Sequence, residues 1–192
     1  VSCYAAISAL AGIDKHDLDK TPVVCLFDHE EVGSVSSVGA SGNFLSNTLN
    51  RIMSNLSIES RAIALENSLC ASVDGAHATH PNYLERHDID HIIRLNEGIV
   101  IKRNANQRYA TDAVGEAIAK QICVANEIPY QIFANRSDLS CGSTIGPTNA
   151  ANLGVRTIDL GIPQLSMHSA REMCGVKDQD HLRHFCKSFL IE

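Results

Sequence analysis

The stretch "GIVIKRNANQRYATDAVGEAIAKQICVANEIPYQIFAN", residues 98–135, decides the fold. It begins with an apolar, β-branched run at 98–104, which predicts a buried strand. Residues 111–127 then place apolar side chains at helical spacing, with Thr111 as the expected N-cap. A second apolar run at 130–135 predicts another strand. A strand, a helix and a strand in this order are typical of an α/β protein, in which helices pack on a sheet.

The alternation continues on both sides of this stretch. Buried strands are predicted for "TPVVCLF" (21–27), "LCASVD" (69–74) and "VRTIDLG" (155–161). Residues 75–97 carry Gly, Pro, four His and many charges, and they predict a long loop. Further helices are expected at 1–10, 41–56, 61–68, 144–154 and 178–191. The predicted fold class is therefore α/β, with a mixed, largely parallel sheet flanked by helices.

Composition excludes several classes of protein. The 192 residues carry a net charge of -6 and contain no run of Lys or Arg, so a nucleic-acid surface is not expected. No apolar stretch approaches the roughly 20 residues of a membrane span, and no signal peptide is visible. The seven cysteines include no Cys-x-x-Cys pair, which favours reduced thiols in a cytoplasmic protein. The chain opens with "VSCYAAISAL", without Met, so we expect a fragment.

Side chains of metal-ligand type follow three of the predicted strands. Glu30 and Glu31 come after the first strand, Asp74 ends the second, and His168 follows the last. Sites in open α/β sheets form beyond the carboxyl ends of strands, and carboxylates with a histidine suit zinc. One Glu of the pair could bind the metal while the other acts as a base on water. Each residue alone is more often structural, as a solvated loop, a turn or a packed histidine.

Other chemistries have weaker support in the sequence. His77 and His80 are spaced to share a helix face, but Pro81 favours a loop there. No glycine-rich phosphate loop, dinucleotide fingerprint or nucleophile elbow is present.

Five longer motifs occur in one order along the chain. They are "FDHEEVGS", "SVDGAHATHPNY", "GIVIKRNANQRYAT", "CGSTIGP" and "DLGIPQLSMHSAREM". Together they resemble the aspartyl aminopeptidase family of dinuclear zinc exopeptidases, over nearly the whole chain. The resemblance implies a zinc-dependent exopeptidase fold.

The resemblance also implies roles for the residues after the strands. Glu30 corresponds to the general base, and Glu31 to a zinc ligand. Asp74 and His168 correspond to further zinc ligands. A full-length enzyme of this kind would hold two zinc ions.

Two more positions are substrate-facing in the family, Lys102 and His77. A lysine in a pocket favours a carboxylate, so Lys102 is the candidate for binding an acidic substrate side chain. The alternative is a surface lysine that extends its amine from a strand into water.

By the same resemblance, residues 1–192 are the C-terminal portion of a metallopeptidase catalytic domain. An early His-x-Asp motif, a Leu-Asp-Asn segment and an inserted dimerisation domain are absent, so this chain by itself is expected to be inactive. The full-length enzyme would release N-terminal Asp or Glu from peptides and form a homo-oligomer, with no nucleic-acid or membrane partner. Alternatives are another co-catalytic zinc hydrolase of this fold, or a non-catalytic self-assembling cargo or structural protein.

Overall fold

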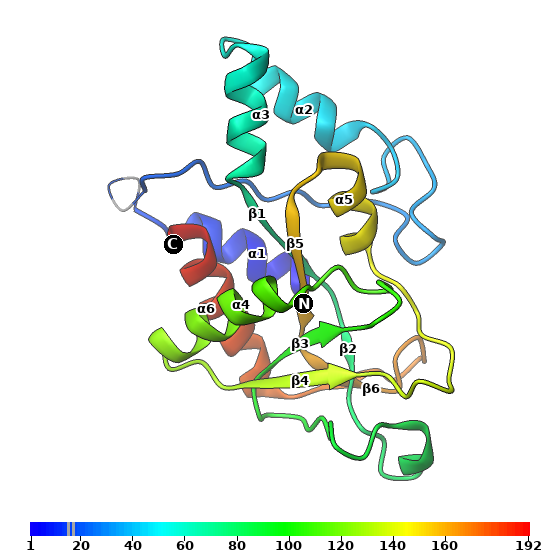
Figure 1. Ribbon diagram of the computed structural model, residues 1–192. Helices are drawn as coiled ribbons and strands as arrows, with labels where there is room; N and C mark the ends of the chain where they lie inside the picture. The colour runs from blue at the N-terminus through cyan, green and yellow to red at the C-terminus, as the bar shows by residue number, and fades with distance from the viewer. Residues whose placement is uncertain (15, 17) are drawn as a thin grey trace.

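A computed structural model describes residues 1–14, 16 and 18–192. Its main sheet has four strands, β1 (Leu69–Val73), β3 (Ile99–Arg103), β4 (Tyr130–Ala134) and β5 (Arg156–Gly161). Their order is β1-β5-β3-β4 (Figure 1). β1 runs parallel to β5 and β3 parallel to β4, whereas β3 and β5 are antiparallel. The predicted mixed, largely parallel α/β sheet is confirmed.

Three helices cover one face of this sheet, α1 (Ser2–Ala11), α4 (Ala113–Ala125) and α6 (Val176–Ile191) (Figure 1). The main apolar core lies between them and the strands. Its fully buried large side chains are Ile99, Ile101, Ile158, Leu160, Leu182 and Phe185. Burying one such side chain stabilises the fold by about 1.5–3 kcal/mol, so this layer holds the domain together.

The opposite face carries a smaller apolar cluster and more polar residues. It is covered by α5 (Ile145–Leu153) and by a second sheet of three short strands. These strands are β2 (Ala76–His77), β6 (Pro163–Leu165) and β7 (Met173–Cys174). The cluster includes Val100, Phe133 and Tyr109. Because neighbouring strand residues point to opposite faces, Lys102 lies on the same face as Val100.

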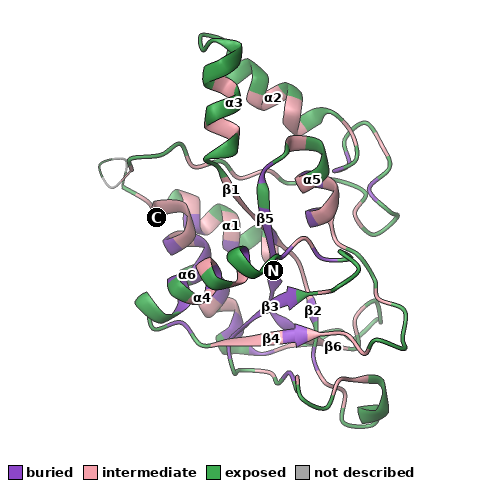
Figure 2. Ribbon diagram, in the orientation of Figure 1, coloured by how far each residue is buried: buried purple, intermediate pink, exposed green. Residues whose placement is uncertain are grey.

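A helical hairpin extends away from the sheet (Figures 1 and 2). It consists of α2 (Phe44–Ile52) and α3 (Ile58–Glu66), and neither helix has a buried residue. The long loop predicted after β1 is present, apart from β2 and a single 3-10 turn, η2 (Leu84–Arg86). Within the described residues no helix has the length and apolarity needed to cross a membrane.

Two predictions of local structure are wrong. Residues 21–27 form no strand, and Val23 and Leu26 are 41% and 45% exposed. An apolar run becomes a strand only where another strand satisfies its backbone groups, and no described strand pairs with this one. The N-cap of α4 is Asp112, not Thr111: the Asp112 carboxylate accepts from the Gly115 N–H at 2.6 Å.

Candidate active site

Two of the predicted zinc ligands meet across the fold. The His168 Nε2 atom lies 2.9 Å from Glu31 Oε2. The two side chains remain 69% and 70% exposed. An ion pair this exposed adds at most about 1 kcal/mol to stability, so the fold gains little from bringing these residues together.

Local backbone conformation sets the position of both residues. His168 has a positive φ of 67° within a tight turn, and its N–H donates to Glu172 Oε1 at 2.6 Å. The loop that carries the Glu pair is closed at His29, which also has a positive φ, of 64°. The His29 Nδ1 atom is 2.7 Å from Ser36 Oγ. Non-glycine residues adopt this conformation rarely, and often at functional sites.

Glu30, the predicted base, lies among the other predicted site residues. Partial burial raises the pKa of its carboxyl, and the negative charges of Asp74 and Glu31 raise it further. A positive charge on Lys102 or His168 lowers this pKa. A carboxyl with a raised pKa in a charged cluster is a usual feature of groups that exchange protons with a substrate.

Lys102 is buried, with 1% of its side chain exposed, so the interpretation as a surface lysine is wrong. Its ammonium donates to the Gly75 carbonyl at 3.0 Å and lies 3.9 Å from Asp74 Oδ2. It also lies 5.2 Å from the centre of the Tyr109 ring. Burial lowers the pKa of this amine, while Asp74 and other nearby carboxylates favour its charged form. A lysine is rarely buried without such partners.

His77 lies on β2, near Lys102 and Asp74. Its side chain is exposed, yet the surrounding chain removes part of its hydration and so lowers its pKa. A positive charge on His87, Lys102 or His168 lowers this pKa further. The neutral imidazole is therefore favoured, and it can accept or donate a hydrogen bond.

The donor set fits zinc only in part. Glu31 and His168 offer a carboxylate oxygen and an imidazole nitrogen, both ordinary zinc donors. Asp74, the third predicted ligand, faces Lys102 instead. No group of three or more His, Cys, Asp or Glu side chains able to hold a metal occurs among the described residues. The arrangement is a partial site rather than a complete metal cage.

Two residues near Lys102 were not singled out from the sequence. Tyr109 is 5% exposed and packs edge-on against Phe133, with the ring centres 6.1 Å apart. Asp159 is fully buried on β5. The sequence did contain a signal for Asp159, because an acidic residue inside a predicted buried strand requires a partner. Tyr109 had no such signal, since an aromatic residue in a polar loop is common.

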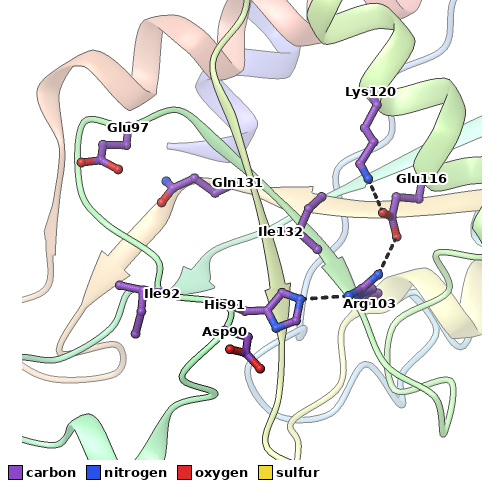
Figure 3. A pocket seen from close by; sticks show the side chains of 9 residues that line it. All are labelled: Asp90, His91, Ile92, Glu97, Arg103, Glu116, Lys120, Gln131 and Ile132. Atoms are coloured by element: carbon purple, nitrogen blue, oxygen red, sulfur yellow. Dashed lines mark hydrogen bonds and ion pairs between the residues drawn. The ribbon is translucent and has the colours of Figure 1, made fainter.

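A separate hollow is lined by residues of α4, β3, β4 and the segment 90–97 (Figure 3). Its volume is about 400 Å³. Three of its charged side chains contact one another: Glu116 lies 3.5 Å from Arg103 and 2.6 Å from Lys120, and Arg103 lies 2.9 Å from His91. None of the predicted site residues lines this hollow, and we assign it no catalytic role.

Comparisons with family models, curated proteins and solved structures all point to the same family. A family model described as "Aminopeptidase I zinc metalloprotease (M18)" matches residues 1–190. A "Probable M18 family aminopeptidase 2" from Pseudomonas fluorescens is 48% identical over 98% of this chain and 43% of its own length. Among solved structures, a cryo-EM structure of an Ape4 and Nbr1 complex is 44% identical, with a TM-score of 0.91, covering 98% of this chain and 37% of that one.

A second similar structure is that of the Saccharomyces cerevisiae mApe1 dodecamer. It is 35% identical with a TM-score of 0.75, and the match covers 85% of this chain and 36% of that chain. The fold and the matches assign the chain to a family of zinc metalloproteases. The chain belongs to the M18 family, aminopeptidase I, and spans about 43% of the length of the first curated relative.

Proposed function

We propose that the full-length protein is an aminopeptidase that releases N-terminal Asp or Glu from peptides. The observation that carries the acidic specificity is the buried ammonium of Lys102, 3.9 Å from Asp74 and beside Glu30. One of its three donors is used by the Gly75 carbonyl. A substrate carboxylate reaches the remaining donors when the side chains that cover Lys102 shift.

Each of the predicted site residues has a separate role in the proposed reaction. Glu30 takes the proton of the attacking water and passes it to the leaving amine. Glu31, Asp74 and His168 would hold zinc, with two ions in the full-length enzyme. Zinc supplies a Lewis acid that polarises the scissile carbonyl. His77 faces the substrate as a neutral hydrogen-bonding group.

The proposal extends to the organisation of the full-length protein. Residues 1–192 form the C-terminal part of its catalytic domain. The dodecameric relative supports a homo-oligomer, and the seven unpaired cysteines are compatible with the cytoplasm.

A substrate panel tests the proposed specificity. The full-length protein, loaded with zinc, is assayed on matched peptides with N-terminal Asp, Glu, Ala or Leu. We expect kcat/KM to be highest for Asp and Glu. In Lys102→Ala the value for Asp falls about 10–100-fold, because a charge-assisted contact is worth roughly 1.5–3 kcal/mol, while the value for Ala changes little. An equal fall for both substrates contradicts the role of Lys102. Activity only on other substrate classes would favour a different zinc hydrolase.

A further inference from the structure

Asp159 is a buried carboxylate that accepts hydrogen bonds from two segments distant in sequence. It lies on β5 between Ile158 and Leu160, which point into the main core, so its own side chain points to the opposite face. Its Oδ2 accepts from the Ala110 N–H at 2.6 Å, and its Oδ1 accepts from the Thr144 hydroxyl at 2.6 Å. Both contacts are short, as charge-assisted hydrogen bonds are.

Both of the segments that bond to Asp159 are close to Tyr109. Ala110 directly follows Tyr109, whose ring stands 5.2 Å from the Lys102 ammonium. Thr144 ends the loop that carries Cys141, and Cys141 packs against the cluster of Tyr109 and Phe133. The Asp159 carboxylate therefore links the backbone next to Tyr109 to the loop whose Cys141 packs against the Tyr109 cluster.

The start of α5 is shaped around the same carboxylate. A Cβ atom added at Gly146, in the first turn of α5, would lie 2.1 Å from Asp159 Oδ2. This is shorter than any ordinary contact, so position 146 has space for glycine alone while the carboxylate stays in place. The amino end of a helix also favours a negative charge.

We propose that Asp159 is a positioning residue, which holds Tyr109 and the Cys141–Thr144 loop as one wall beside Lys102. This inference rests on the proposed function, in which Lys102 binds the acidic substrate side chain. Asp159 touches no substrate. It acts through Tyr109 and the loop, so its loss weakens substrate binding and leaves the proton transfer by Glu30 intact.

Gly146→Ala tests the proposal in the full-length protein, with Val124→Ala as the control outside the wall. The added methyl at 146 displaces Asp159, whereas Val124 lies on α4 and is 69% exposed. For an N-terminal Asp peptide we expect KM to rise about tenfold in Gly146→Ala, the loss of one charge-assisted hydrogen bond, with kcat within about threefold. Val124→Ala is expected to match the parent. If Gly146→Ala lowers kcat and leaves KM unchanged, or changes neither, the proposal is overturned.

Thr144 provides a second pair of variants. Thr144→Val removes the donor to Asp159, and Thr144→Ser restores it. We expect Val to raise KM and Ser to return it to the parent value. A merely structural role would lower stability in Val without this recovery of KM in Ser.

Alkylation of Cys141 gives a measurement that does not depend on activity. The rate at which iodoacetamide labels Cys141 is measured by mass spectrometry relative to the exposed Cys3. We expect Thr144→Val and Gly146→Ala to increase this ratio about tenfold, because the loop is released, and Val124→Ala and Thr144→Ser to leave it unchanged. An unchanged ratio in all four variants overturns the proposal. If the parent protein releases no N-terminal residue, the proposed function is wrong. The labelling rates still test whether Asp159 positions the Cys141–Thr144 loop, because they do not depend on activity.

Discussion

Adjacent residues of β3 show how differently the two faces of the sheet are built. Ile101 points toward the helices and Lys102 toward the candidate site, and both are almost completely buried. β5 repeats the contrast with Leu160 and Asp159. The helix face excludes water with apolar side chains, which stabilises the fold. The site face buries charges, which is unfavourable unless each charge has partners. The main apolar core and the candidate site therefore lie on opposite faces of the same strands.

Glu30→Gln is expected to have the largest effect, on the site face. In the full-length enzyme the turnover number should fall about 10²–10⁴-fold, because the amide cannot accept the proton, while bound zinc is retained. Kinetics together with metal analysis check this. Glu31→Gln is the matched control and should lower zinc occupancy instead. Near-normal kcat in zinc-loaded Glu30→Gln contradicts the role of Glu30 as the base.

Phe185→Ala tests the helix face. Phe185 is fully buried in α6 and stacks on Phe189, with ring centres 6.0 Å apart. Removing it should lower the free energy of unfolding by about 3–5 kcal/mol, measured by urea titration. Phe44→Ala is the control, since this ring in α2 is 47% exposed. Its loss should lower the free energy by less than half as much. Equal losses would mean that the hairpin packs as tightly as the core.

Asp112→Ala should have an intermediate effect. It removes the side chain that caps α4 at the Gly115 N–H. We expect the free energy of unfolding to fall by about 0.5–2 kcal/mol. Asp112→Asn keeps a capping oxygen and should stay close to the parent. If Asn and Ala lose the same amount, the exposed ion pair of Asp112 with Arg156, rather than the cap, provides the stabilisation.

His168→Ala should have the smallest effect on stability. Because its pair with Glu31 is exposed, we expect the free energy of unfolding to change by less than about 1 kcal/mol.

Equilibrium dialysis should show at most one weakly bound zinc in the parent 192-residue chain and less in His168→Ala, since a catalytic zinc usually needs three protein ligands. Two tightly bound zinc ions in the parent chain would mean that the ligand set is wrong.

The Glu31–His168 contact shows why the site could be predicted only in part. The sequence placed Glu30, Glu31, Asp74 and His168 after strands, and the structure brings Glu31 to His168 and Asp74 to Lys102. The sequence could not show that Asp74 faces a lysine instead of the other two ligands. Such pairings depend on how loops distant in sequence meet, and periodicity contains no information on this.

The sequence by itself determined the helices and most strands of the α/β fold, because apolar spacing reports which side chains avoid water. It also determined the family, through five ordered motifs. Only the tertiary structure decided that residues 21–27 form no strand, that Lys102 is buried, and that Asp159 joins Ala110 to Thr144. Each of these depends on a partner elsewhere in the chain, since a strand needs a neighbouring strand and a buried charge needs donors or counter-charges.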